Sequence, residues 1–411
     1  MPGWGVLGAA LIVVGALAGV PGLVFVGLLV LATTWLRTLW SRRGLQEVSY
    51  ERHLATDRAV WGDEIGLDVT VWNRKLLPLA WLRTDDFVSE EAELRERPLA
   101  HSERPGQRVL ANTWTLAWFE RVTRHFHLRA TRRGVYRFNA VRLQVADIFA
   151  RDAASVERPY PATFVVRPRS VPVRRTAADR APLGSRKARH SLFHDPALFA
   201  GVRPYEPGDP PRRLHWKATA RLGRPVSKRF DPSREREIIL ALDVQTVPGP
   251  NYWLMVYDDK LLESLCVAAA SLARSILGDG AACGLAAAAY AGTVQRMVYV
   301  PPGGGAGQLA LIADHLGRLS RFASAPYESL LTSLAHRVAP GSTILTLSAR
   351  DPAPYLPAMR RLARSGYPVR HVALGPEALG FARRVRAAGI PAEIAELNPD
   401  WKTANALVIA G

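Results

Sequence analysis

The residues most capable of chemistry lie close together near the middle of the chain. Asp209 and His215 are six positions apart, and an aspartate that orients an imidazole can form a general base. Such a base needs a nucleophile to activate, yet the sequence places no Ser or Cys beside the pair. The pattern keeps a hydrolase or transferase using His215 and Asp209 as an alternative. It favours a hydrogen-bonded structural or docking role for the segment.

Turn and capping signals predict the elements that hold these residues. Pro207-Gly208 fits the central pair of a type II turn. Asp209 fits a helix N-cap with Pro210 in the first helical position, and Gly223 fits the residue that ends the helix. We expect this short helix to turn one face toward a core, made of Leu214, Ala218 and Leu222.

The remaining polar, aromatic and turn residues of the segment form a predicted binding set for a partner or for interdomain docking. Its members are Tyr205, Pro207, Gly208, Asp209, Arg212, Arg213, His215, Trp216, Lys217 and Arg221. Their order resembles the hallmark of a bacterial family known as domain of unknown function fifty-eight. That hallmark is Tyr-x-Pro-Gly-Asp followed by Arg-x-x-His-Trp-Lys-x-(Ser/Thr)-Ala-Arg, and residues 201–237 are the signature segment here.

The resemblance implies a layout and a role for the whole chain. The layout is two N-terminal membrane spans, a β domain, the signature and a von Willebrand type A-like domain. Members of the family are thought to work with MoxR-type AAA+ ATPases, which implies a scaffold or adaptor in envelope-related or complex-assembly processes. This role needs no reaction centre, so we expect a protein that is not an enzyme.

Residues 238–411 predict an α/β domain in their own right. The apolar run Ile238–Leu242 has the character of a buried parallel strand, and a helix is expected over 258–277. Two strands over 283–290 and 293–300 read as a hairpin, and alternating helices and strands follow. Such alternation predicts an open, mostly parallel sheet with helices on both faces. The early hairpin resembles the von Willebrand type A fold.

That fold often binds a divalent cation through Asp-x-Ser-x-Ser, and this chain departs from the motif. Asp243 matches the first position, but Gln245 and Val247 replace the two serines. Ser348-Ala349 stands where an Asp-Gly pair is usual. We therefore expect a degenerate remnant at Asp243 and Gln245 with no metal and no cofactor. Asp243 is predicted to cap a helix or to pair with an Arg or Lys of the signature.

Alternating apolar residues predict a β-sandwich over residues 45–170. Ile65, Leu67, Val69 and Val71 follow the two-residue period of a half-buried strand, and turn signals recur along the segment. Residues 172–200 are basic and without periodicity, which predicts a linker.

The N-terminus predicts a transmembrane helical hairpin over residues 1–40. No charged residue occurs from Gly3 to Leu36, and Val20-Pro21-Gly22 divides this stretch into two short spans, 4–19 and 23–40. Arginines after the second span predict soluble domains facing the cytoplasm of a bacterial inner membrane. A cleaved signal peptide is the alternative, since Ala16-Leu17-Ala18 resembles a cleavage site.

Charge supplies a further alternative. The formal net charge is +18, and residues 151–237 hold +11 of it, from 20 basic and 9 acidic groups. A basic segment can bind nucleic acid or an anionic lipid surface. Aromatic residues do not interleave with the basic ones between Arg174 and His190, which makes nucleic acid the weaker choice. Two cysteines exclude a disulfide-stapled scaffold.

Overall fold

The computed structural model of the protein describes eight stretches of the chain. These are residues 3–146, 154–176, 199–205, 214–230, 237–247, 257–291, 297–398 and 400–411. They divide into two units, 1–167 and 168–411, and each unit has its own hydrophobic core. The described residues contain eight helices and several sheets, so the predicted α+β multidomain class is confirmed.

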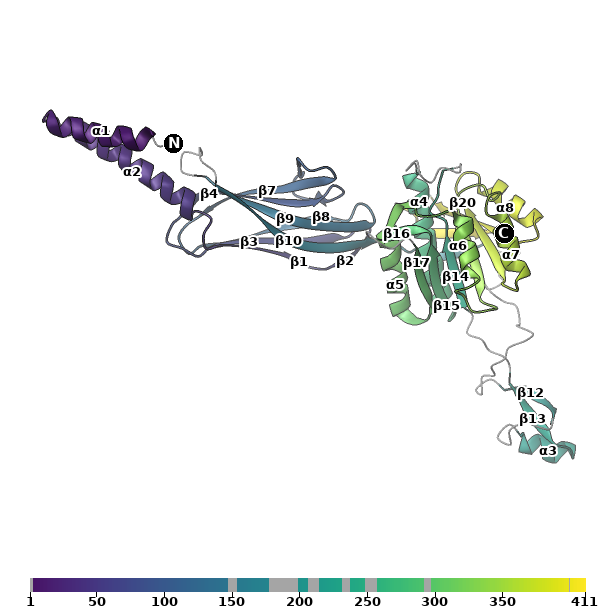
Figure 1. Ribbon diagram of the computed structural model, residues 1–411. Coiled ribbons are helices and arrows are strands. Elements are labelled where there is room, and N and C mark those ends of the chain that lie inside the picture. The colour runs from purple at the N-terminus through teal and green to yellow at the C-terminus, as the bar shows by residue number, and fades with distance from the viewer. Residues whose placement is uncertain are drawn as a thin grey trace. The chain divides into compact units, whose positions relative to one another are not determined.

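Unit 1 begins with a helical hairpin of α1 (Gly3–Leu17) and α2 (Pro21–Arg43), shown in purple in Figure 1. The chain breaks where the sequence predicts, at the proline. Glycines allow the two helices to approach closely. A Cβ added to Gly27 would lie 2.7 Å from the carbonyl oxygen of Gly8, and one added to Gly15 would lie 2.8 Å from Leu23. Small residues at a helix–helix contact are typical of packing in lipid.

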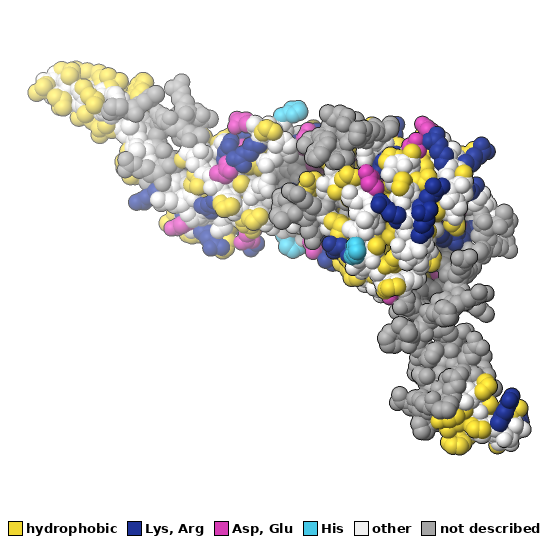
Figure 2. Space-filling model, turned by 45° about the vertical axis from the view of Figure 1, so that its right-hand side comes forward, with side chains coloured by type: hydrophobic (Ala, Val, Ile, Leu, Met, Phe, Trp, Pro, Cys, Tyr) yellow, Lys and Arg dark blue, Asp and Glu magenta, His cyan; other side chains and the backbone are white. Residues whose placement is uncertain are grey.

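The outer surface of the hairpin is apolar, as Figure 2 shows. Its exposed large side chains include Trp4, Val6, Val13, Leu17, Phe25, Leu29 and Trp35. Both helices are short apolar segments, Gly3–Leu17 and Pro21–Leu36. Within the described residues, the helix whose length and hydropathy fit a full membrane span is Asp259–Gly278, and it is mostly buried in unit 2.

The rest of unit 1 is two sheets that share one core. Strands β1 (Val48–Leu54), β3 (Glu64–Asn73), β8 (Arg121–Arg129) and β5 (Glu93–Leu94) form the first sheet in that order. The second sheet runs β2 (Arg58–Val60), β10 (Ala154–Arg167), β9 (Gly134–Val145), β4 (Leu79–Ser89), β7 (Gln107–Leu116) and β6 (Ala100–His101). The predicted alternation on β3 is confirmed, because Ile65, Leu67, Val69 and Val71 are all buried.

A buried ionic cluster joins the two sheets of unit 1. Arg52 on β1 donates from Nη1 to Oδ1 of Asp86 on β4 at 2.5 Å, and neither side chain is exposed to solvent. The Tyr50 hydroxyl donates to the other carboxylate oxygen. Arg52 also donates to the carbonyl of Tyr160 on β10 and lies 4.2 Å from the ring centroid of Phe138. The two charges are therefore paired with each other and bonded to groups from both sheets, while Nε of Arg52 stays buried without a hydrogen-bond partner.

Unit 2 is built on an eight-stranded sheet. Its order is β11 (Val173–Arg175), β22 (Ala406–Ala410), β21 (Ala392–Asn398), β20 (Val369–Leu374), β19 (Thr343–Ser348), β14 (Glu237–Leu242), β15 (Ala282–Ala287) and β17 (Val298–Gly303). Strands β15, β14, β19, β20 and β21 run parallel to one another. At the two ends of this group, β17 runs antiparallel to β15 and β22 runs antiparallel to β21. The predicted antiparallel pair is therefore present, with β17 as its second strand. Residues 292–296, which the prediction assigned to the turn and to the start of that strand, lie outside the described residues.

Helices cover both faces of this sheet (Figure 1). α4 (Asp259–Gly278) and α5 (Gly305–Arg318) share one core with the sheet. On the other face lie α6 (Tyr327–Leu334), α7 (Leu356–Arg364) and α8 (Ala378–Ala387). A short pair, β16 (Ala289–Ala291) with β18 (Leu319–Ala323), stands apart from the main sheet.

The start of the predicted linker is part of the sheet. Residues 173–175 form β11, which pairs in parallel with β22, and Arg175 lies 3.7 Å from Glu393 on β21. The backbone amide of Val171 donates to the hydroxyl of Ser271 on α4. Backbone hydrogen bonds therefore make residues 173–175 part of the sheet, although their composition alone indicates a loop. The remainder of the linker, residues 177–198, lies outside the described residues.

Candidate functional site

The signature segment forms a small module between two stretches of unit 2. β12 (Phe199–Pro204) pairs antiparallel with β13 (Val226–Phe230), and α3 (Trp216–Leu222) packs against β13. The amide of Tyr205 donates to the carbonyl of Pro225 at 3.1 Å, which extends the pairing of β12 and β13 by one residue. Half of the predicted binding set falls outside the described residues: Pro207, Gly208, Asp209, Arg212 and Arg213.

The helix of the module starts later than its sequence signals indicate. Nδ1 of His215 accepts a hydrogen bond from the amide of Ala218 at 3.0 Å, so His215 is the N-cap. Leu214, just before it, is bridged to Ser227 and therefore extended. The prediction that Asp209 caps this helix is wrong, because six residues separate it from Trp216. The predicted end at Gly223 is confirmed, with φ of 65°.

The described part of the module exposes hydrophobic and basic side chains (Figure 2). Trp216 is 69% exposed, and Lys217 and Arg221 are exposed beside it. The predicted core face is wrong at Leu222, which is exposed, and α3 contains no buried residue. A seven-residue helix has little surface to bury, and its tie to β13 is polar: Thr219 Oγ1 accepts from the amide of Val226 at 3.2 Å.

The capping bond decides what His215 can do. Its Nδ1 is an acceptor, so the neutral ring carries its proton on Nε2. An aspartate that orients a catalytic imidazole accepts a hydrogen bond from Nδ1–H. That arrangement is incompatible with the cap seen here, and the His215 ring is instead a structural element of the helix start.

A second cluster lies at the carboxyl ends of β14 and β19. Asp243 follows β14, and its Oδ2 accepts from Nε of Arg350 at 2.7 Å and from the hydroxyl of Ser348 at 2.9 Å. Its Oδ1 accepts from the amide of Gln245 at 3.1 Å. The carboxylate is buried, which raises its pKa, and the Arg350 guanidinium opposes that shift. Tyr355 lies below the guanidinium, 5.2 Å from ring centroid to Cζ.

This cluster occupies the topological switch point of the sheet. If β14 is counted as the first strand, the spatial order is third, second, first, fourth, fifth, sixth. The second and third strands are added on one side of β14, and the fourth, β19, is added in parallel on its other side. Open α/β sheets bind ligands in the crevice at such a point. Here Arg350 places a cationic side chain on the carboxylate that a metal ion would use. Gln245 contributes its backbone amide, a donor that no metal can use as a ligand.

The partner of Asp243 was missed by the sequence reasoning. We expected a helix cap or a pair with a signature cation, and the partner is Arg350, two residues beyond β19. A signal was present, because the adjacent ends of the first and fourth strands meet in this topology and a buried aspartate needs a cation. Asp351, the other nearby acid, is exposed and pairs with Arg384 at 2.6 Å. The described residues contain no cluster of three or more His, Cys, Asp or Glu side chains arranged for a metal.

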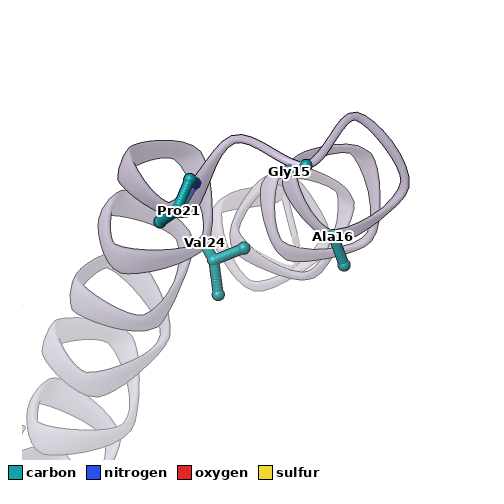
Figure 3. A pocket seen from close by; sticks show the side chains of 5 residues that line it. Gly15, Ala16, Pro21 and Val24 are labelled. Atoms are coloured by element: carbon teal, nitrogen blue, oxygen red, sulfur yellow. The ribbon is translucent and has the colours of Figure 1, made fainter.

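A recess with solely apolar lining lies at the turn of the N-terminal hairpin (Figure 3). Gly15, Ala16 and Gly19 line it from the α1 side, and Pro21 and Val24 line it from α2. None of these residues can titrate or act as a nucleophile. The recess is a consequence of small residues at the helix contact and carries no chemistry.

Comparison with known proteins gives a family match that includes the signature segment and part of the α/β unit. Residues 201–338 match the family model described as "Protein of unknown function DUF58". The chain is 26% identical over 235 residues to "Uncharacterized protein YeaD" of Bacillus subtilis (strain 168). That alignment covers 55% of this chain and 52% of the relative, so the chain matches about half of the relative's length. Both matches support the DUF58 family.

Two solved structures resemble part of the chain. The CARDB domain of a Pyrococcus furiosus protein, crystallised with di-metal ions, has a TM-score of 0.20 and 16% identity, covering 29% of this chain and 91% of that one. A non-cellulosomal cohesin from Archaeoglobus fulgidus has a TM-score of 0.20 and 10% identity, with the same two coverages. Scores this low carry no argument about function.

Proposed function

We propose that this protein is a membrane-tethered adaptor whose signature module docks a partner protein on the cytoplasmic side. The observation that carries the proposal is the exposure of Trp216 on a short helix that also exposes Lys217 and Arg221. Trp and Arg are enriched among the side chains that dominate protein–protein binding. A residue type that usually anchors an interface is here left in solvent, which fits a surface awaiting a partner.

The two other candidate centres support contact over catalysis. His215 uses Nδ1 for a helix cap, and Asp243 is held by Arg350, Ser348 and a backbone amide. The hydroxyl beside Asp243, that of Ser348, is buried and donates its proton to that carboxylate at 2.9 Å. On this proposal the protein carries no reaction centre of its own.

We propose a membrane anchor for the N-terminal hairpin. Large apolar side chains face outward and glycines face inward, the reverse of a helix pair that is stable in water. Arg37, Arg42 and Arg43 follow the apolar part of α2, and the positive-inside rule then favours a cytoplasmic location for both units in a bacterial inner membrane.

The α/β unit is proposed to be a von Willebrand type A-like domain. Support comes from the strand order with a reversed third strand, β17, at one edge. The proposed partner is a MoxR-type AAA+ ATPase, the partner class that the family resemblance implies. A basic module suits an acidic surface on such a partner.

The test is co-purification of a MoxR-type ATPase with the full-length protein in detergent, with and without ATP. Trp216→Ala combined with Lys217→Glu is expected to reduce capture at least tenfold. Arg364→Glu makes a matched charge change at an exposed position on α7, and it is expected to retain capture. Equal capture by all three proteins would exclude the module as the docking surface.

A further inference from the structure

Two loops of unit 1 lie side by side at one end of the sandwich. Residues 74–78 connect β3 to β4, and residues 117–120 connect β7 to β8. The side-chain amide of Asn73 donates to the carbonyls of Leu77 and Ala117, at 3.0 and 2.8 Å. The amide of Phe119 donates to the carbonyl of Lys75 at 3.3 Å. These bonds hold the loops together as one surface.

The same end of the sandwich receives the chain from the N-terminal hairpin. α2 ends at Arg43 and β1 begins at Val48. Lys75 Nζ donates to the carbonyls of Gly44 and Gln46, at 2.9 and 2.6 Å. The amide of Arg74 donates to the carbonyl of Glu47. The first loop is therefore bonded directly to the segment that leaves α2.

Three large apolar side chains project from these loops into solvent. Leu76 is 74% exposed, Trp118 is 64% exposed and Phe119 is 57% exposed. We name them the apolar tip. Among the described residues 45–146 and 154–167, the only other exposed large hydrophobic residue is Val60, at 39%. Exposed apolar surface is thus concentrated at the end of the sandwich that meets the hairpin. Isolated exposed hydrophobic residues would instead be scattered over the whole sandwich.

The backbone of this end is strained. Among the described residues, the non-glycine positions with positive φ are Glu47, at 55°, and Phe119, at 53°. A left-handed backbone is unfavourable for a bulky side chain, and an exposed phenylalanine gains no core burial in return. Strain without a packing reason points to a function for the conformation.

Two basic side chains lie on the strand ends next to the apolar tip and contact Trp72 of β3. Arg74 lies over the ring of Trp72 at 4.0 Å, and Arg121 approaches the same ring at 5.9 Å. Two acidic side chains near these arginines already have partners. Glu51 pairs with Arg121 at 3.2 Å, and Glu120 accepts a hydrogen bond from the amide of Ala117. Tryptophan prefers the boundary between headgroups and acyl chains, and basic residues favour the anionic leaflet.

We propose that the apolar tip inserts into the headgroup–acyl boundary of the same bilayer that holds the hairpin, so that the sandwich rests on the membrane at two points. The inference rests on the proposed membrane anchor. Its chemistry is that of an interfacial contact, with Leu76, Trp118 and Phe119 in the apolar layer and Arg74 and Arg121 at the phosphates.

The test places an environment-sensitive fluorophore on single introduced cysteines of the full-length protein in proteoliposomes. The vesicles contain phosphatidylethanolamine and phosphatidylglycerol, with or without brominated acyl chains as quenchers. Both native cysteines are buried, so labelling is directed to the new thiol. Trp118→Cys reports the tip, Val13→Cys reports the hairpin, and Glu103→Cys is the control in an exposed loop at the opposite end of the sandwich.

We expect brominated lipid to quench the labels at 118 and 13 at least twofold and to leave the label at 103 unchanged. Leu76→Asp combined with Trp118→Cys is expected to lose the quenching at 118. Quenching at 13 without quenching at 118 would overturn the tip and leave the anchor standing. Quenching at 118 without quenching at 13 would support the tip and overturn the anchor. Absence of quenching at both positions would overturn both proposals.

Discussion

Each structural unit of the chain buries an arginine against an aspartate, and the two pairs differ in their surroundings. Arg52 and Asp86 lie between two sheets, with Tyr50 on the carboxylate and the Phe138 ring against the guanidinium. Arg350 and Asp243 lie at the ends of two neighbouring parallel strands. The first pair connects layers of a core. The second fills the crevice in which this topology usually binds a ligand.

The difference shows that position in the fold, more than residue type, determines the role of a buried ion pair. Each pair leaves one buried guanidinium nitrogen without a hydrogen-bond partner, Nε of Arg52 and Nη2 of Arg350, so the two pairs differ in position and not in this respect. In unit 1 the pair lies between the two sheets of a core. In unit 2 it lies at the carboxyl ends of two parallel strands.

The largest effect is expected from Asp86→Ala. It leaves the Arg52 guanidinium buried without its counter-ion, and removing one member of a buried pair costs about 3–5 kcal/mol. We expect the thermal unfolding transition of the sandwich to fall by roughly 10 °C in full-length protein. Asp68→Ala breaks an exposed pair with His125 and is the control, with an expected change near zero. Equal effects for both variants would refute a structural role for the Asp86 pair.

Asp243→Ala is expected to destabilise unit 2 by a smaller amount, about 2–3 kcal/mol. The reason is that the Arg350 side chain lies at the carboxyl end of the central strands and retains slight solvent access, whereas the Arg52 side chain has none. Hydrogen exchange of β14 and β19 amides measures the change. Combining Asp243→Ala with Arg350→Met is expected to recover most of the loss. A double variant less stable than Asp243→Ala alone would contradict this account.

Acid is expected to weaken unit 2 through His371. Burial lowers the pKa of His371 to about 3, so the folded state keeps the ring neutral while the unfolded state protonates it near pH 6.5. The unfolded state binds more protons between these values, and stability therefore falls as pH falls from 6.5 toward 3. The expected loss is about 2 kcal/mol between pH 6.5 and pH 5.

Thermal unfolding of unit 2 as a function of pH measures this loss, and His371→Phe should flatten the profile. His125→Gln changes an exposed ring in unit 1 and should leave the profile unchanged. A wild-type profile that is flat from pH 6.5 to 5 would show that the ring is protonated in the folded protein.

The smallest effect concerns divalent cations. The Arg350 guanidinium already neutralises Asp243, so we expect the wild-type protein not to bind Mg²⁺ at this carboxylate. Asp243→Ala should therefore leave the Mg²⁺ affinity unchanged. Calorimetry with Mg²⁺ and Mn²⁺ on wild-type and variant protein makes the comparison. Stoichiometric binding by the wild type that disappears in Asp243→Ala would show a metal site after all.

Periodicity and composition were sufficient for the regular elements. The alternation on β3 and the apolar run of β14 follow directly from burial on one or both faces, and both were predicted. β11 was not, because three residues pair only through the backbone and leave no pattern in side chains. The late start of α3 was also missed, since Asp209-Pro210 is a strong helix signal until tertiary pairing extends Leu214.

The site could be predicted only in part, for a related reason. The exposure of Trp216 depends on how much of the short helix packs against the rest of the module. The sequence near Trp216 contains no pattern that predicts this packing. The Arg350–Asp243 contact joins positions 107 residues apart and exists only through the strand order. Even so, Asp243 itself was identified, because an acid directly after a buried strand is visible in the sequence.

One feature of unit 2 has a mechanical consequence. β11 ends at Arg175 and β14 begins at Glu237, so the stretch carrying the signature leaves one sheet and returns to the same sheet. A single cut inside that stretch would leave both fragments attached. Pulling on the stretch would load both strands, and the three-residue pairing of β11 with β22 would detach well before β14, which is hydrogen-bonded on both sides.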